Sequence, residues 1–396
     1  MKRRTFLRQS AIASTSLWVP AFIRHYQSER LSSRHKKILV VIQWSGGNDG
    51  LNTLVPLGQD TYYQLRPNLA LQGEEVISLT PELGMHASLA PLVDGIHQGF
   101  IQPVNQVGYP NPDRSHFRSM DIWQSASGSD QTWSTGWLGR YLDHECAACS
   151  PHSAIEVGDA LTLALKGKER QGFVLEDPEL LQRAASNPYL RALAGRPVTR
   201  SEGAVPYLYK VMQETHSSAD LLGQAYRAHP PSRDFPATPL GKQLEIIARL
   251  ILSDEDIHIF YASLTGFDTH ANQKPAQSRL LKEYAEALQI FMAELQHHQL
   301  WQDTLVLTFS EFGRRVAENA SRGTDHGAAN QIWLAGGSLT GDPLRRSVPD
   351  LSKLIDGDLA FRTDFRSIYQ AILGQWLATD ANQVLNRDFP EFSLHG

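Results

Sequence analysis

The chain of 396 residues has little cysteine, no excess of positive charge and no internal repeat or low-complexity tract. A formal net charge of -5 gives no electrostatic basis for binding nucleic acid, so no nucleic-acid partner is expected. The two cysteines, Cys146 and Cys149, form a single C-x-x-C. A structural zinc site needs a second ligand pair at a matching spacing, and this sequence has none.

The chain also lacks a long apolar run near its start. Residues 9–23 are too few and too polar to cross a bilayer, which takes roughly 20 apolar residues. They follow Arg3-Arg4-Thr5-Phe6-Leu7, an arginine pair with twin-arginine export spacing. We therefore predict that residues 1–35 are a twin-arginine signal segment and linker. A disordered basic tail is the alternative, and retention of the signal as a membrane anchor stays open because no clean cleavage site is visible.

This signal predicts a periplasmic or otherwise exported protein that meets the twin-arginine export machinery. In an oxidising compartment, a local disulfide between Cys146 and Cys149 is expected rather than redox catalysis. No stable membrane span is expected unless the signal is retained.

Apolar runs alternate with helical patterns along the rest of the chain, and 41% of its residues are hydrophobic. The alternation predicts an α/β fold with a mostly parallel sheet flanked by helices. Strands are expected at residues 38–42, 103–109, 155–158, 257–262, 304–309 and 331–334, and helices at 86–99, 116–125, 281–295 and 364–377. Residues 36–396 are predicted to form one domain, with a mainly helical insertion around residues 160–235.

Polar motifs stand where the expected strands begin or end. They are Gly46-Gly47-Asn48-Asp49-Gly50, Asp268-Thr269-His270, Ser310-Glu311-Phe312-Gly313-Arg314 and Thr324-Asp325-His326-Gly327. Loops at the carboxyl ends of parallel strands converge on one crevice, so these distant residues can meet. Carboxylates and imidazoles are ligands for divalent cations. The candidate metal ligands are Asp49, Asp268, His270, Glu311, Asp325 and His326.

The order of these motifs, together with R-S-H-F at Arg114 to Phe117, resembles the exported bacterial proteins called domain of unknown function 1501. The resemblance covers roughly residues 36–377. That family is grouped by similarity with the alkaline phosphatase and sulfatase superfamily. The resemblance implies an alkaline phosphatase-like fold, a nucleophile at Ser115 where a helix starts, and one or two divalent cations. Zinc, manganese, magnesium and calcium are all compatible with these ligands.

The sequence departs from the superfamily pattern at two of its metal-ligand motifs. His270 follows Asp268 by two residues instead of four, and Asn272 stands in the fourth place. Glu311 is followed by Phe312 where the superfamily usually has an imidazole ligand. The resemblance therefore supports the fold more strongly than it supports two filled metal sites.

The chemistry implied is hydrolysis of phosphate or sulfate esters in the cell envelope. Transfer of either group builds negative charge that cations can stabilise. Ser115 would need metal coordination to act as a nucleophile. Arg118 or Arg314 could hold the nonbridging oxygens of an anionic ester substrate or glycan.

Each candidate also has a structural interpretation. Asp49, Asp325 and His326 lie in Gly-rich segments where turn geometry alone can require such residues, and Ser115 is a plausible helix cap. Asp268 and His270 can form a hydrogen-bonded pair. Glu311 and Arg314 can form an ion pair.

Other functions fit the sequence in part. Cys149-Ser150-Pro151 imitates the sulfatase C-x-P-x-R but lacks its arginine, and Gly46 to Asp49 imitates a block of Gly-Asp-Ser-Leu esterases whose other blocks are missing. The alternative from a different class is a non-catalytic periplasmic binding or scaffold protein on a degenerate phosphatase-like fold.

Overall fold

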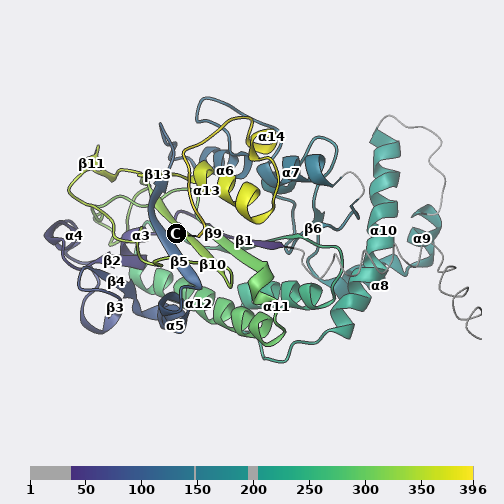
Figure 1. Cartoon of the computed structure of the whole chain (residues 1–396), viewed down its shortest axis with the longest axis horizontal. Coiled ribbons are helices and arrows are strands. Elements are labelled where there is room, and N and C mark those ends of the chain that lie inside the picture. Colours follow the sequence, from purple (N-terminus) through teal and green to yellow (C-terminus); the bar gives the residue numbers. More distant parts are fainter. Residues whose placement is uncertain (1–36, 147–148, 195–203, 396) are drawn as a thin grey trace, which may run out of the picture. The chain divides into compact units, whose positions relative to one another are not determined.

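The computed structural model describes residues 37–146, 149–194 and 204–395, so the predicted signal segment lies outside the described residues. An eight-stranded sheet organises the chain from Lys37 onward (Figure 1). Its strands run in the order β13-β5-β10-β9-β1-β8-β6-β7. Neighbouring strands are parallel except at β10, which is antiparallel to both β9 and β5. The prediction of a mostly parallel sheet is confirmed.

In chain order, the strands of this sheet are β1 (Ile38–Ser45), β5 (Ile101–Gly108), β6 (Ala154–Glu156), β7 (Phe173–Val174), β8 (Ile259–Thr265), β9 (Thr304–Phe309), β10 (Asn330–Gly336) and β13 (Thr363–Asp364). The central strand β1 is buried from Ile38 to Trp44, as expected for a strand covered on both faces. Its alternating side chains enter two separate apolar clusters. Val40 and Ile42 belong to one, while Leu39 and Val41 belong to the other.

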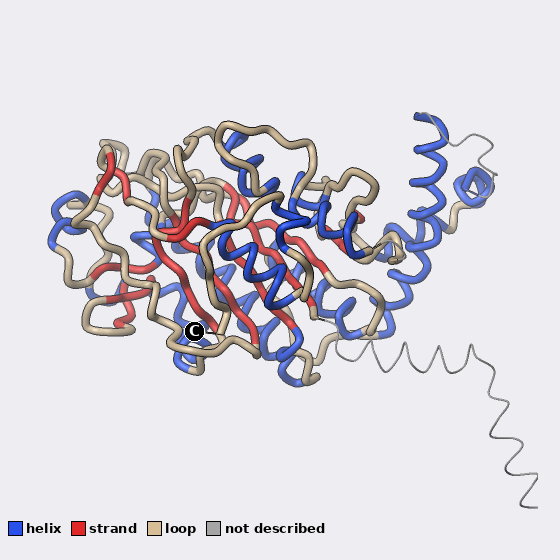
Figure 2. Tube along the Cα trace, turned by 45° about the horizontal axis from the view of Figure 1, so that its top comes forward, coloured by secondary structure: helices blue, strands red, loops and turns tan. Residues whose placement is uncertain are grey.

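Helices cover both faces of the sheet, as the views in Figures 1 and 2 show. The cluster that contains Val40 is completed by η2 (Ala87–Leu92), α5 (Val93–His97), α11 (Pro239–Leu252) and α12 (Gln273–His297). The cluster that contains Leu39 is completed by α6 (His116–Ser125), α7 (Trp137–Glu145), α13 (Phe365–Ala371), the π-helix η5 (Ile372–Trp376) and α14 (Ala381–Leu385). This is the three-layer arrangement that alternating strands and helices favour.

Smaller elements surround the sheet. A three-stranded antiparallel sheet joins β2 (Leu54–Pro56), β4 (Leu83–His86) and β3 (Val76–Ser78), and β11 (Leu354–Ile355) pairs with β12 (Asp358–Leu359). Short helical segments complete the described connections: α3 (Gly50–Thr53), α4 (Asp60–Leu65), η1 (Gly73–Glu75), η3 (Leu163–Leu165) and η4 (Trp301–Asp303).

Most predicted elements occur within a few residues of their expected positions, and α6 matches its predicted bounds. The helix expected over residues 86–99 is instead split into the 3₁₀ segment η2 and the short α5. Pro91 lies inside η2, and proline cannot donate the backbone hydrogen bond that an α-helix requires there.

The predicted insertion contains α8 (Pro178–Ala185), α9 (Pro188–Ala194) and α10 (Ala204–Ala228). The bounds of the insertion and of the single domain remain predictions. A disulfide joins Cys146 to Cys149, as expected. Among the described residues, every helix is either too short or too polar to cross a bilayer.

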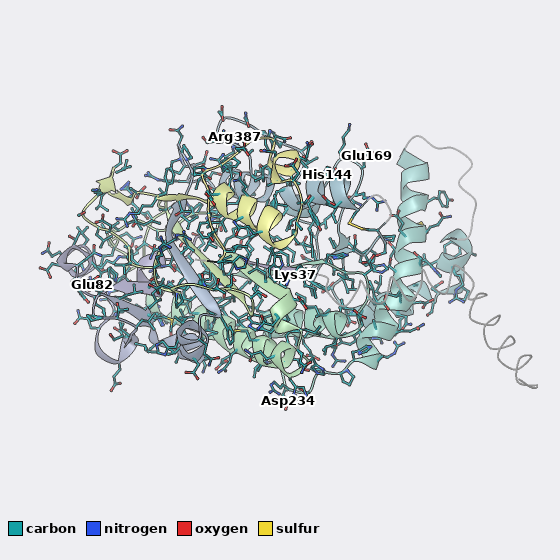
Figure 3. All side chains as sticks on the ribbon, in the orientation of Figure 1. Lys37, Glu82, His144, Glu169, Asp234 and Arg387 are labelled. Carbon is teal, nitrogen blue, oxygen red and sulfur yellow. A yellow bond between two sulfur atoms is a disulfide. The ribbon has the colours of Figure 1, made fainter. Side chains whose placement is uncertain are left out.

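Many charged side chains lie on the outside of the fold, and Figure 3 labels Glu82, His144, Glu169, Asp234 and Arg387 among them. Glu156 on β6 is one of several charged residues that are buried, with only 4% of its surface exposed. Burial raises the pKa of Glu156 from 4.5 to about 7, although the backbone N–H of Thr162 donates to its carboxyl group and opposes the shift.

Replacing Glu156 by glutamine should therefore remove a pH dependence of stability. Between pH 4.5 and about 7, Glu156 keeps its proton in the folded protein but loses it in the unfolded chain, so stability falls as pH rises. At about pH 8 we expect Glu156→Gln to exceed the wild type by roughly 3 kcal/mol in the free energy of unfolding, and at about pH 4 to equal it. Urea unfolding at both pH values measures the difference, and a constant difference would contradict the expectation.

Candidate metal centre

The site lies where three parallel strands of the sheet end together. In the register of the sheet, Ser45 at the end of β1 pairs with Thr265 at the end of β8, and Gln43 pairs with Phe309 at the end of β9. The loops that follow carry Gly46, Asp268 and Glu311. Two of the predicted ligands, Asp268 and Glu311, thus line one pocket with Gly46.

Gly46 is required by the close approach of these loops. Its φ of 121° lies in the left-handed region, and a Cβ atom there would stand 2.4 Å from the backbone nitrogen of Asp268. The N–H of Gly46 donates to Oε1 of Glu311 at 2.9 Å. The glycine-rich motif therefore allows the first loop to pack against the other two.

Arg314 connects the loops of the site through hydrogen bonds. Its buried guanidinium donates to the carbonyl groups of Gly46, Gly47, Phe267 and Thr324. It also contacts Oδ1 of Asp268 at 2.8 Å. Because its donors are used in this way, Arg314 positions the site, and the prediction that it holds substrate oxygens does not fit these contacts.

Two imidazoles point at Asp268 while their other nitrogens are held elsewhere. His326 donates from Nδ1 to the carbonyl group of Arg114 at 2.7 Å, and its Nε2 lies 3.2 Å from Oδ1 of Asp268. His116, the first residue of α6, has Nδ1 2.9 Å from Oε1 of Glu311 and Nε2 3.5 Å from Oδ2 of Asp268. His116 Nε2 is buried and has no hydrogen-bond partner among the described residues.

A third imidazole, His270, follows the same pattern. Its Nδ1 lies 3.4 Å from Asp325, and its Nε2 lies 3.0 Å from Oδ1 of Asp268 and 2.9 Å from Nε2 of His326. Thus each of the three rings has Nδ1 beside an oxygen acceptor and Nε2 beside the Asp268 carboxylate.

This arrangement fits a divalent cation. One ligand atom each from His116, Asp268 and His326 lies within 4.8 Å of the others. Ligands about 2 Å from a tetrahedral cation are roughly 3.3 Å apart. The Nε2 atoms of His116, His270 and His326 lie 3.5, 3.0 and 3.2 Å from the Asp268 carboxylate, which is similar. Histidines that bind metal commonly donate their second N–H to a carboxylate or carbonyl group, which fixes the ring orientation. Glu311, Asp325 and the Arg114 carbonyl group meet that description.

The ionisation of Asp268 agrees with this assignment. Burial raises the pKa of Asp268, but hydrogen bonds from Arg314 and His326 outweigh it and lower the pKa to about 2. The hydrogen bond to Glu311 raises the pKa of His116 despite partial burial. Hydrogen bonds from Asn319 and His270 lower the pKa of Asp325. Asp268 is therefore an ionised carboxylate, the form that binds metal.

An open pocket of about 490 Å³ adjoins the cluster. It is lined by Ser45, Gly46, His116, Phe117, Met120, Gly266, Asp268 and Glu311. The pocket gives a small molecule access to Asp268, which is 48% exposed.

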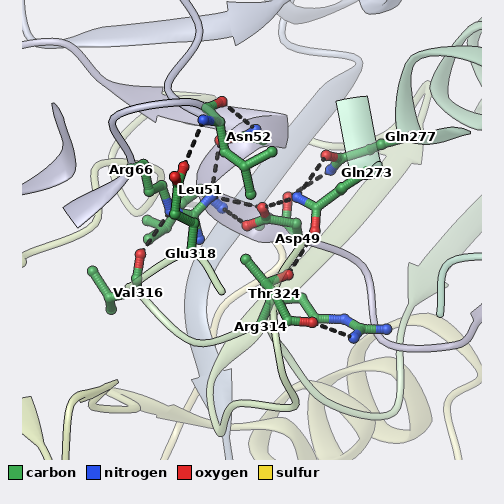
Figure 4. Close-up of polar contacts among 12 residues, drawn as sticks. Asp49, Leu51, Asn52, Arg66, Gln273, Gln277, Arg314, Val316, Glu318 and Thr324 are labelled. Carbon is green, nitrogen blue, oxygen red and sulfur yellow. Dashed lines mark hydrogen bonds and ion pairs between the residues drawn. The ribbon is translucent and has the colours of Figure 1, made fainter. Parts of the chain in front are cut away.

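Asp49 is a correction to the predicted ligand set. Its side chain is 1% exposed and forms an ion pair of 2.6 Å with the fully buried Arg66. The amide of Gln273 donates to the same carboxylate oxygen, and the N–H of Leu51 donates to the other (Figure 4). Since both oxygens accept hydrogen bonds from protein donors, Asp49 holds the loop after β1 and caps α3 rather than facing a cation.

Arg118 is the second correction, because its guanidinium donates to the carbonyl groups of Gly128, Ser129 and Gln131 and so holds a loop instead of a substrate. Ser115 is exposed and makes no side-chain cap on α6, so the capping interpretation is also wrong. It lies between Arg114, whose carbonyl group accepts a hydrogen bond from His326, and His116, a member of the imidazole cluster. Its role as a nucleophile stays a prediction.

His116 is the site residue that the sequence motifs did not identify. It lies within the R-S-H-F motif, next to Ser115, which the sequence analysis assigned as the nucleophile. The signal available was its position at a helix start after a strand, where side chains commonly project toward the sheet edge.

Comparison with solved structures finds similar folds at low identity. The lipoteichoic acid synthase LtaP from Listeria monocytogenes aligns with a TM-score of 0.33 and 10% identity over 77% of this chain and 66% of that chain, just under two thirds of its length. The zinc complex of the C-terminal periplasmic domain of EptC from Escherichia coli aligns with a TM-score of 0.33 and 8% identity over 82% of this chain and 79% of that chain. A magnesium-bound mutant of TAB5 alkaline phosphatase aligns with a TM-score of 0.32 and 11% identity over 77% of this chain and 92% of that chain.

Similarity at this level does not transfer a site or a reaction to this chain. No curated protein matches the sequence. A family model does match residues 101–343, more than half of the chain, and includes the motifs around His116, Asp268, Glu311 and His326. The chain therefore belongs to the family described as "Protein of unknown function (DUF1501)".

Proposed function

We propose that this protein is a metal-dependent hydrolase of phosphate or sulfate esters that acts in the cell envelope. The observation that carries the proposal is the convergence of three imidazole Nε2 atoms on the Asp268 carboxylate, beside an open pocket. His116, Asp268 and His326 would hold the cation, with His270 as a further ligand. Three protein ligands and a fourth position open to a pocket are typical of a catalytic zinc site, whereas four protein ligands are typical of a closed structural one.

The charge of the pocket explains why a cation is needed. Asp268 and Glu311 both line it, and Arg314 is buried beneath with its donors used. An anionic ester entering the pocket would meet these carboxylates at close range and be repelled. A bound cation reverses the sign of the local charge and supplies Lewis-acid stabilisation of the substrate oxygens.

The surrounding residues then have distinct roles. Glu311 orients His116, and Asp325 orients His270. The Arg114 carbonyl group orients His326. Arg314 fixes Asp268. Ser115, exposed beside this cluster at the start of α6, is proposed as the nucleophile, with N–H groups of the helix start available to the anion.

Export through the twin-arginine route belongs to the same proposal. It is supported by the arginine pair near the N-terminus and by the disulfide between Cys146 and Cys149. Disulfides persist mainly in oxidising compartments. Folded export would let the protein acquire its cation before it leaves the cytoplasm.

The test is the metal content of the purified protein together with hydrolysis of phosphate monoesters, phosphate diesters and sulfate esters. We expect about one equivalent of a divalent cation and turnover that chelation abolishes and metal restores. Bound metal without turnover of any ester would favour the binding or scaffold protein instead. Absence of metal would reject both the site and the reaction.

Ser115→Ala separates the nucleophile from the metal ligands. Because the substitution removes only an exposed hydroxyl group, folding and metal content should be unchanged. Turnover should fall by roughly 10³-fold or more, as it does when other hydrolases lose a nucleophile. Ser129→Ala, on the loop after α6, is the matched control and should keep its activity. Equal activity of both variants would exclude Ser115.

A further inference from the structure

The rim of the pocket carries an aromatic side chain that the fold does not use. Phe117 follows His116 on α6 and is 88% exposed, yet it lines the pocket together with Asp268 and Glu311. A phenylalanine this exposed gains almost nothing from burial in the folded protein. Its position next to a candidate ligand places the ring where a bound substrate would pass.

Both polar and apolar side chains line the pocket. His116, Asp268 and Glu311 supply the polar groups, while Phe117 and Met120 supply the apolar ones. The amide of Gln43 donates to the sulfur atom of Met120 at 2.8 Å, which holds that side chain in place. Thioether and aromatic groups both contact aromatic rings favourably.

Backbone rather than side chains forms another part of the lining. Gly46 and Gly266 both line the pocket and both have positive φ, 121° and 112°. At Gly46 the missing Cβ lets the backbone of Phe267 and Asp268 pack closely, so this glycine shapes the loops that bound the pocket. With a volume of about 490 Å³, the pocket is within the range of sites that bind ligands of drug size, and it is larger than a phosphate or sulfate group needs.

We propose that Phe117 selects esters whose alcohol part carries a planar apolar ring, which stacks on Phe117 while the anionic group lies beside His116 and Asp268. This inference rests on the proposed function for the identity of the anionic group. The ring contact itself depends on Phe117 and Met120.

Binding of two phosphonates that cannot be hydrolysed tests the ring contact without turnover. Calorimetric titration of the zinc-loaded full chain should show phenylphosphonate binding about tenfold more tightly than methylphosphonate. Phe117→Ala should lose this preference and Phe117→Trp should keep it. Tyr189→Ala, which removes another exposed aromatic ring on α9, should leave it unchanged.

Equal affinity for the two phosphonates in the wild type, or an unchanged preference in Phe117→Ala, would overturn the inference. Turnover is measured in parallel on phenyl phosphate and phenyl sulfate. A phenyl preference that depends on Phe117, in a protein that hydrolyses neither ester, would uphold the ring contact and reject the hydrolase. Hydrolysis of either ester without a phenyl preference would uphold the hydrolase and reject the ring contact.

Discussion

Asp268→Asn is expected to weaken cation binding at least a hundredfold and to abolish ester hydrolysis. Asp268 is the carboxylate that all three imidazoles approach, at 3.0 Å from His270, 3.2 Å from His326 and 3.5 Å from His116. Outer-shell partners alone commonly contribute 10 to 100-fold in metal affinity, so loss of a central ligand should cost about that or more. Titration with zinc or manganese, followed by calorimetry, measures the change.

The same substitution should leave the fold intact. Asp268 is 48% exposed whereas its partner Arg314 is fully buried, but the Oδ1 atom of the asparagine can still accept the hydrogen bond from Arg314. Arg314 keeps its four carbonyl acceptors when the carboxylate is lost. Asp325→Asn is the graded control, since it disturbs the orientation of His270 without removing a proposed ligand, and it should weaken binding by roughly 10 to 100-fold. Unchanged affinity in Asp268→Asn would show that the cluster is not a metal centre.

Asp49→Ala should have the opposite signature, with a large loss of stability and no loss of metal ligands. The substitution leaves the guanidinium of Arg66 buried without its counter-charge. Removing one partner of a buried ion pair typically costs about 3–5 kcal/mol. Whole domains are stable by only about 5–15 kcal/mol, so this is a major share. Chemical unfolding of the wild type and the variant measures the difference.

The partly exposed pair of Lys37 and Asp303 provides the control for this comparison. Its side chains are 37% and 25% exposed, so Asp303→Ala should cost about 1 kcal/mol or less. Folded Asp49→Ala protein should still bind the cation with the wild-type stoichiometry. Loss of the cation together with normal stability would restore Asp49 as a ligand.

The sheet was predictable because its strands carry continuous apolar runs. The run from Ile38 to Ile42 identified β1, and the alternation of strands with helices indicated parallel neighbours. What pattern alone did not show was the reversal of β10, because a buried strand has the same apolar composition in either direction.

The site was predictable as a meeting of loops but less so in its roles. Asp268, His270 and His326 do meet, as their positions beside the ends or starts of strands indicated. Asp49 follows a buried strand in the same way, yet it turns toward Arg66, which lies seventeen residues further along the chain. Nothing in the local motif distinguishes a carboxylate that faces a cation from one that faces a buried arginine. His116 was missed because its neighbour Ser115 fitted the expected nucleophile position.

The central claim is that His116, His270 and His326 surround one cation with Asp268. X-ray absorption spectroscopy of the zinc-loaded chain tests it directly, because imidazole ligands give a distinctive outer-shell signal. We predict two or three imidazole nitrogens at about 2.0–2.1 Å and a loss of one imidazole in His116→Ala. A zinc environment made of oxygen ligands alone, or one unchanged in His116→Ala, would contradict the account.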